Sequence, residues 1–207
     1  MHAMPPHAFV YLASQSPRRT QLLDQLGVAH RPLLPDRGED TEGLEEEHRG
    51  ELPLDYVRRV TLLKLNAARA RLQRRRLTEA PILCADTTVS VGRRILGKPQ
   101  GPEHAAEMLR ALSGRTHRVM TCVVVGIGAQ RLLDTSISRV HFAELSETTI
   151  QRYVDSGEPQ GKAGAYAIQG RIAAWIDHIE GSYTGIMGLP LYETTTLLSR
   201  ARVRLEL

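Results

Sequence analysis

The chain alternates between short apolar runs and amphipathic segments. The apolar runs predict buried strands at Phe9–Ala13, Pro81–Ala85, Val119–Ile127, Leu132–Phe142 and Ile172–Ile179. The amphipathic segments predict helices that begin at Pro17, Leu54, Pro102, Ser146 and Pro190. This order of strands and helices favours an α/β protein with a mixed sheet. No linker is long enough to separate independent domains, so we expect one domain over 1–207, with its core at 8–200 and tails at 1–7 and 201–207.

Three local details follow from the same pattern. The helix over Leu54–Arg76 is expected to bury one stripe, made of Tyr56, Val60, Leu63, Ala67 and Ala70. The strand at Pro81–Ala85 is expected to end where Asp86 and Thr87 begin. The segments Thr88–Val91 and Ile95–Leu96 flank a Gly-Arg-Arg tip, which predicts a hairpin.

The first strand and helix of the chain frame a predicted anion site. Ser16 is expected to cap the helix and Pro17 to take its first position, while Gly27 follows the helix end. Free backbone N–H groups then point at the same place as Ser14, Arg18 and Arg19. A pair of arginines is often merely solvated, but ligands of open α/β sheets bind at the carboxyl ends of strands, which favours a phosphate site here.

Other charged residues suggest chemistry only in combination. Asp86, at the predicted strand end, could act as a general base or hold a divalent cation, or it could simply bond nearby backbone. Lys98 and Lys64 could reach a phosphate, although lysines in turns and on helices are mostly solvated. Glu39 lies in an acidic loop and carries no signal by itself. Together they fit metal-assisted hydrolysis of a nucleoside polyphosphate.

The loop Gly157–Gly170 half-resembles a Walker A sequence. Its spacing is one residue short, and the magnesium-binding hydroxyl after Lys162 is absent, so a P-loop enzyme is excluded. Its glycines and Lys162 can still approach a ligand. Gln169 carries a donor and an acceptor, which suits the edge of a base, although such a side chain often bonds local backbone instead.

Composition narrows the class of protein. The chain has 207 residues, 42% of them hydrophobic and 4% aromatic, with a net charge of +4. The low aromatic content argues against a nucleic-acid partner, and the basic helix end at Arg74–Arg76 is explained by the helix dipole. The acidic run Glu45–Glu47 is expected to be solvated. Both cysteines lie in apolar runs and are expected to be buried and reduced; with no signal peptide and no membrane span, we expect a cytoplasmic protein.

Seven ordered blocks of the chain resemble the Maf family of nucleoside triphosphate pyrophosphatases, from about Val10 to Leu198. They read LASQSPRRTQLL, YVRRVTLLKLNAA, CADTTV, LGKP, LSGRTHRVMT, KAGAYAIQG and IEGSYTGIMGLPLYET. The resemblance implies an elongated α/β fold related to the inosine-triphosphatase-like fold, with two lobes around a cleft. It also implies conversion of a nucleoside triphosphate to the monophosphate and pyrophosphate with a divalent cation, Mg²⁺ or Mn²⁺.

The resemblance also assigns roles to residues. Asp86 would be the general base, and Glu39 would share the metal with it. Lys64 and Lys98 would line the cleft, and the triphosphate would be held by Ser14, Ser16, Arg18 and Arg19. The acidic loop before Pro53, which contains Glu39, is longer than is usual for the family.

Three positions indicate the substrate within the family. Members specific for dTTP and UTP are similar to this chain at Arg19, Thr87 and Gln169, which favours these substrates over 7-methyl-GTP. The competing class is a non-catalytic nucleotide- or nucleic-acid-binding regulator, in keeping with the family's association with cell division. The family's tendency to dimerise leaves a homodimer open.

Overall fold

The computed structural model of the protein describes residues 7–40 and 43–205 and is built around one mixed sheet of seven strands. The strands are β1 (Val10–Leu12), β2 (His30–Pro32), β3 (Ile82–Val91), β4 (Arg94–Leu96), β5 (Thr116–Ile127), β6 (Gln130–Phe142) and β7 (Ile176–Glu180). Their order is β2-β1-β3-β5-β6-β7, with β4 beside β3. The pairs β1–β2 and β1–β3 are parallel and the rest are antiparallel. The predicted mixed α/β class is confirmed.

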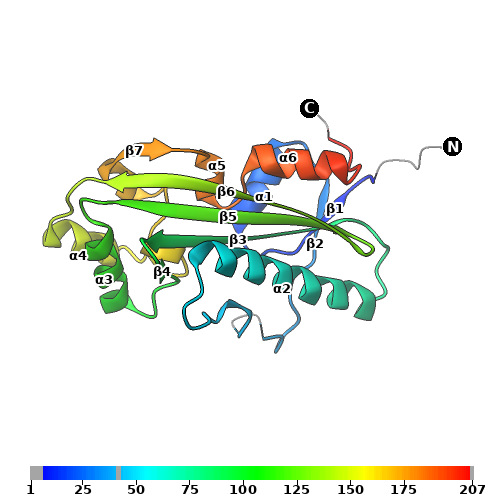
Figure 1. Ribbon diagram of the computed structural model, residues 1–207, viewed down its shortest axis with the longest axis horizontal. Coiled ribbons are helices and arrows are strands. Elements are labelled where there is room, and N and C mark those ends of the chain that lie inside the picture. Colours follow the sequence, from blue (N-terminus) through cyan, green and yellow to red (C-terminus); the bar gives the residue numbers. More distant parts are fainter. Residues whose placement is uncertain (1–6, 41–42, 206–207) are drawn as a thin grey trace.

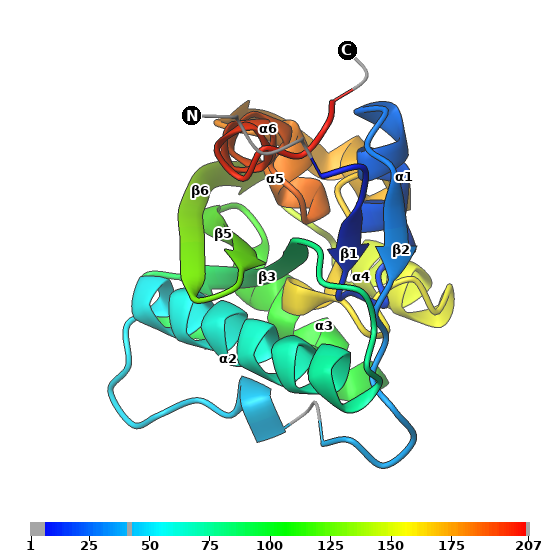
Figure 2. The same ribbon diagram turned by 90° about the vertical axis from the view of Figure 1, so that its right-hand side faces the viewer.

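Helices cover both faces of this sheet. They are α1 (Pro17–Gln25), α2 (Pro53–Arg74), α3 (Pro102–Leu112), α4 (Glu147–Asp155), α5 (Tyr183–Met187) and α6 (Leu191–Arg200), with 3-10 turns η1 (Gly43–Glu45), η2 (Ala163–Ala165) and η3 (Arg171–Trp175). Helix α2 runs along one face, while α1, α5 and α6 lie on the other (Figures 1 and 2). The pair α3 and α4 sits at one end of the long axis (Figure 1). In the described residues, no helix is long and apolar enough to cross a membrane.

The predicted stripe of α2 is only partly right. Tyr56 and Val60 are buried as expected, but Leu63 and Ala67 are half-buried and Ala70 is exposed. The buried line instead continues through Thr61, Leu65, Ala68 and Arg71. Helical periodicity predicts a buried face, but contact with the sheet decides which edge of that face lies deepest.

The largest difference from expectation is in β3. The predicted strand Pro81–Ala85 and the first arm of the hairpin form one continuous strand, so Asp86 lies in its middle and not at its end. β3 pairs with β5 from Ile82 to Ser90 without a break. Asp86 and Thr87, near the centre of this strand, line a cleft, whereas Thr88 is buried.

Other boundaries match more closely. Ser146 caps α4 by accepting a hydrogen bond from Thr149 N at 3.2 Å, and α3 begins at Pro102 as predicted. The predicted strand Ile172–Ile179 is wrong in its first half, which forms η3. Parts 1–6 and 206–207 of the predicted tails lie outside the described residues. In the described parts of these two tails, His7 and Val203 form a parallel β-bridge.

Candidate active site

A gap in strand pairing creates the site. On one edge of β3, β1 pairs with Ile82 and Leu83, and β4 pairs from Val89 to Val91. Among the described residues, 84–88 have no strand neighbour on that edge. The residues that follow β1, 13–19, line the same cleft as residues 85–87, and α1 begins among them. Because neighbouring strand residues point to opposite faces, the gap lets side chains from both faces of β3 reach one cleft.

The cleft has a volume of about 540 Å³, which falls in the usual range for small-molecule sites. Its lining joins sequence segments that lie far apart. Of the predicted site residues, the cleft brings together Ser14, Ser16, Arg18, Arg19, Lys64, Asp86, Thr87, Lys98 and Lys162. It also includes Glu45 and Arg71, which the sequence analysis did not single out.

The start of α1 has the geometry of an anion site. Pro17 opens the helix as expected, but the Ser16 side chain makes no capping hydrogen bond. Ser14 Oγ instead accepts from Ser16 N at 3.2 Å. The predicted cap is therefore wrong in its side chain, and the Ser16 hydroxyl stays available to a ligand beside the helix N-terminus.

The two arginines of α1 tie this helix to α5. Arg18 Nε donates to Met187 O at 3.3 Å, and Arg19 Nε donates to Gly188 O at 2.8 Å. Arg19 also donates to Ser14 Oγ at 3.1 Å and to Thr87 Oγ1 at 3.4 Å. Burial lowers the pKa of the Arg19 guanidinium despite the attraction of Asp86. Arg19 is thus held by three neighbours, whereas Arg18 keeps more of its donors for a ligand.

Opposite α1, four charged side chains form a chain of ion pairs. Lys64 Nζ lies 2.5 Å from Asp86 Oδ1 and 2.7 Å from Glu45 Oε1. Lys98 Nζ lies 2.6 Å from Glu45 Oε2. Lys64 reaches the cleft from α2, Asp86 from β3 and Glu45 from η1. Two carboxylates and two ammoniums therefore alternate along one wall.

Within this series of ion pairs, each charged group stabilises the charged form of its neighbours. Burial by itself would raise the pKa of Glu45, but the adjacent Lys64 and Lys98 outweigh it and leave that pKa below its usual range. Burial would likewise lower the pKa of Lys64, yet Asp86 and Glu45 raise it. Both groups are accordingly held in their charged forms at neutral pH.

Glu45 was missed by sequence reasoning, and the expectation that Glu45–Glu47 is solvated is wrong for this residue. Tyr56 Oη donates to Glu45 O at 2.8 Å, and Arg59 Nη2 donates to Glu46 O at 2.8 Å. These bonds from α2 hold the acidic loop against the cleft. A loop of several similar carboxylates contains no local signal for the one that meets a lysine.

Glu39 is placed elsewhere. It receives two bonds from the buried Arg71, at 3.1 Å from Nε and 2.5 Å from Nη2, and it is absent from the lining of the cleft. Arg71 also donates to Leu33 O at 2.7 Å. Beside it, Arg74 and Arg75 both pair with Asp36. The basic end of α2 is thus largely matched by the acidic loop.

Of the two predicted site residues in the loop Gly157–Gly170, the structure places one in the cleft. Lys162 lines the cleft, and its ammonium donates to Glu158 O. Burial and the proximity of Arg18 lower the pKa of Lys162. Gln169 is exposed and does not belong to the lining, so the structure does not bring it together with Arg19 and Thr87.

The remaining wall is apolar. Its side chains belong to one hydrophobic cluster and comprise Val89, Val119, Tyr166, Ile168 and Ile186. Tyr166 Oη lies 2.7 Å from Nε2 of the buried His117. An apolar wall with an anchored aromatic ring, next to a strongly charged wall, suits a ligand with both a planar apolar part and a phosphate chain.

Comparison of the sequence with known proteins identifies the family of this chain. A family model described as "Maf-like protein" matches residues 9–201. The chain is 58% identical over 202 residues to the dTTP/UTP pyrophosphatase of Polaromonas sp. (strain JS666 / ATCC BAA-500), which covers 98% of this chain and 100% of the relative. It is 57% identical over 190 residues to the protein of that name from Albidiferax ferrireducens (92% of this chain, 95% of the relative). A Burkholderia pseudomallei protein with the same name is 53% identical over 204 residues, 98% of each chain. The chain belongs to the Maf family.

Proposed function

We propose that this protein is a nucleoside triphosphate pyrophosphatase that hydrolyses dTTP and UTP to the monophosphate and pyrophosphate. The observation that carries the proposal is the alternation of carboxylates and ammoniums along the cleft that the start of α1 also lines, in the order Asp86, Lys64, Glu45 and Lys98. The names of relatives that are more than half identical over nearly their whole length give it further support.

The residues divide the work by their chemistry. Arg18, Lys98 and the N–H groups at the start of α1 would bind the phosphate chain, with Ser14 and Ser16 beside them. Asp86 would take a proton from the attacking water, which adds to the α-phosphorus as pyrophosphate leaves. Charge neutralisation and positioning would supply most of the rate acceleration.

A divalent cation, Mg²⁺ or Mn²⁺, belongs to the proposal. Both Asp86 and Glu45 contact the same ammonium of Lys64, and they are the carboxylates that would hold the cation. Within the described residues, no three His, Cys, Asp or Glu side chains form a complete metal site. That fits Mg²⁺, which commonly takes one or two carboxylates and completes its shell with substrate phosphates and water. When bound, the cation would neutralise phosphate charge.

The carboxylate assignment departs from the one that the resemblance implied. Glu39 is engaged by Arg71, whereas Glu45 stands beside Asp86 through Lys64. We therefore propose Glu45 as the partner of Asp86. The role in metal binding that the resemblance implied for Glu39 stays a prediction, which the variants Glu45→Gln and Glu39→Gln test.

Pyrimidine specificity would depend on Arg19 and Thr87 at the cleft. Gln169 would have to move toward the cleft to contribute, since it is exposed. The cytoplasm as the site of action and a homodimer as the assembly complete the proposal. The alternatives are turnover of 7-methyl-GTP and a binding protein without turnover.

The test is pyrophosphate release from dTTP, UTP, CTP, GTP, 7-methyl-GTP and ITP, each with Mg²⁺, with Mn²⁺ and with a chelator. We expect metal-dependent turnover confined to dTTP and UTP. Turnover of 7-methyl-GTP instead would overturn the specificity, and saturable nucleotide binding without pyrophosphate release would favour the regulator.

A further inference from the structure

A buried threonine behind the cleft is linked to two of the specificity positions. Thr121 lies on β5, directly opposite Thr87 in the β3–β5 register, and is fully buried. Its Oγ1 lies 2.7 Å from Gly185 O and 2.9 Å from Thr87 Oγ1. Thr121 is absent from the cleft lining, so it can act on a ligand only through its neighbours.

The inventory of hydrogens fixes the direction of these bonds. A threonine hydroxyl has one hydrogen, and a carbonyl oxygen only accepts. Thr121 must therefore donate to Gly185 O, and Thr87 must donate its own hydrogen to Thr121. Arg19 Nη2 donates to Thr87 Oγ1 at 3.4 Å. These hydrogen bonds run in one direction, from Arg19 to Thr87 to Thr121 to Gly185. Thr87 is left with one lone pair and no hydrogen to offer a ligand in the cleft.

We propose that Thr121 is a positioning residue for substrate specificity, because it fixes Thr87 as a hydrogen-bond acceptor toward the nucleotide. This inference rests on the proposed function and deepens it. Gly185 belongs to α5, whose neighbouring residues Met187 and Gly188 accept from Arg18 and Arg19. The series of hydrogen bonds through Thr121 therefore also holds α5, the helix to which α1 is tied by its arginines.

An acceptor at Thr87 discriminates between pyrimidines. Thymine and uracil carry an N3–H donor, whereas cytosine has a bare acceptor at N3 and an amino group at C4. A site that hydrogen-bonds a substrate N–H rejects an analogue without it, since a buried acceptor would face another acceptor. Without Thr121 the Thr87 hydroxyl could rotate, donate to cytosine N3 and relax this choice.

The experiment compares kcat/KM for dTTP with kcat/KM for dCTP in Thr121→Val, Thr121→Ser and wild type. We expect the dTTP preference to fall about fivefold or more in Thr121→Val and to be restored in Thr121→Ser, which keeps the hydroxyl. Thr88→Val is the matched control. Thr88 is a buried threonine next to Thr87 whose hydroxyl has no hydrogen-bond partner within the described residues. An unchanged preference in Thr121→Val, or an equal loss in Thr88→Val, overturns the inference.

A double-mutant cycle separates the inference from general damage. If Thr121 acts through Thr87, Thr87→Val combined with Thr121→Val should have the same preference as Thr87→Val alone. Additive losses would contradict this. Thr121→Ala replaces the valine variant if the latter does not fold. The proposed function is judged by wild-type turnover of dTTP alone, so its failure is distinct from an unchanged preference in the variants.

Discussion

At the residue scale, the partner of each carboxylate decides what it can do. Asp36, Glu39 and Glu45 belong to the same acidic stretch, yet the first two pair with arginines at the end of α2. Only Glu45 reaches an ammonium in the cleft, at 2.7 Å from Lys64. A carboxylate locked by a guanidinium fork offers few free lone pairs, so geometry favours Glu45 over Glu39 in chemistry.

Asp86→Asn should strongly reduce turnover while the fold and nucleotide binding persist. The amide occupies the same space but cannot take a proton from water, so kcat should fall by about 10²- to 10⁴-fold. Calorimetric binding of dTTP and the thermal midpoint should stay near wild type. Wild-type-like pyrophosphate release from this variant would refute the general-base role.

Glu45→Gln and Glu39→Gln form a matched pair. We expect Glu45→Gln to weaken Mn²⁺ binding about tenfold in the presence of a non-hydrolysable dTTP analogue, measured by electron paramagnetic resonance. Glu39→Gln should leave Mn²⁺ affinity unchanged but lower the free energy of unfolding by about 2 kcal/mol, because buried Arg71 loses a charged partner. The reverse pattern of Mn²⁺ affinities would restore Glu39 as the metal residue.

At the scale of elements, the cleft depends on close packing of η2 against β3. Gly164 has φ +68°, and a Cβ at this position would lie 2.9 Å from Val89 Cγ1. Gly164 N donates to Gly97 O at 3.0 Å, next to Lys98. One glycine therefore lets the Gly-rich loop meet both the central strand and the turn that carries a cleft lysine.

Gly164→Ala should destabilise the protein more than Gly161→Ala. Both glycines have φ near +70°, at +68° and +69°, but a Cβ on Gly161 would meet nothing within 4 Å. We expect about 1 kcal/mol of lost stability at Gly161, from backbone strain alone. At Gly164 the loss should be about 2–3 kcal/mol, because the clash adds to the strain. Urea unfolding measures both, and equal losses would show that the packing against Val89 is loose.

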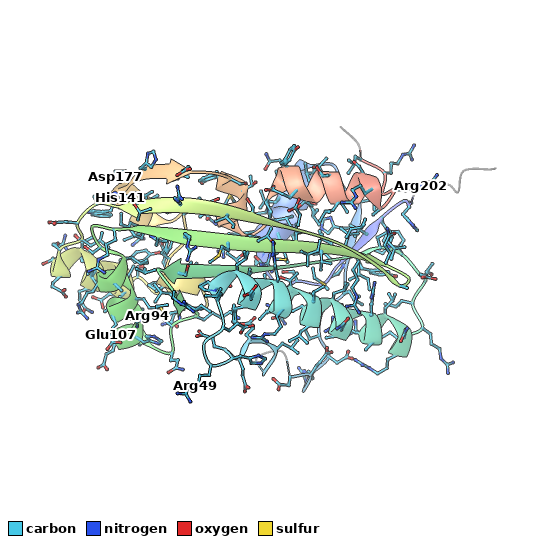
Figure 3. All side chains as sticks on the ribbon, in the orientation of Figure 1. Arg49, Arg94, Glu107, His141, Asp177 and Arg202 are labelled. Carbon is cyan, nitrogen blue, oxygen red and sulfur yellow. The ribbon has the colours of Figure 1, made fainter. Side chains whose placement is uncertain are left out.

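At the scale of the whole molecule, the long sheet carries charged groups at its surface, and a histidine is buried in its core. His141 on β6 and Asp177 on β7 lie beside each other at one end of the sheet (Figure 3), with Nδ1 2.5 Å from Oδ1. His117 is instead buried against Phe142 and Tyr166. Burial lowers the pKa of His117 to about 4 from its ordinary 6.5.

The protein should therefore lose stability as the pH falls from 6.5 toward 4. In that pH range the imidazole of His117 is protonated in the unfolded chain but stays neutral in the folded protein. Unfolding therefore becomes more favourable as the pH falls. The loss from His117 should reach about 3 kcal/mol near pH 4 and grow no further below it. His117→Gln, which cannot titrate, should remove this part of the slope in urea unfolding at a series of pH values. Identical slopes would contradict a neutral buried His117.

Two glutamates, Glu39 and Glu45, affect the stability of the protein at lower pH than His117 does. The pKa values of Glu39 and Glu45 lie below their ordinary value, Glu39 because of its hydrogen bonds from Arg71 and Glu45 because Lys64 and Lys98 outweigh its burial. Their contribution to stability is present above pH 4.5 and disappears as the pH falls through their lowered pKa values. This loss remains in His117→Gln, which separates it from the histidine effect.

Local sequence determined most of the fold of this protein. Most of the long strands and helices follow from apolar periodicity, whereas the short strand β2 and the short helix α5 were not predicted. Pro17, Ser146 and Gly27 mark ends that the structure retains. These features depend on contacts between near neighbours in the chain, so the sequence alone predicts them. Ser14, Ser16, Arg18 and Arg19 were predictable as a cluster for the same reason.

Tertiary structure decided the rest of the cleft. The continuity of β3 through Asp86 depends on pairing with β5, which sets where the strand ends. The choice of Glu45 as the partner of Lys64 and Lys98 depends on the path of a long loop held by α2. The direction of the hydrogen bonds through Thr121 depends on the position of α5 next to β5, where Gly185 O accepts from Thr121. Each of these joins residues far apart in the chain, and local patterns carry no record of such contacts because the energy that selects them arises only on packing.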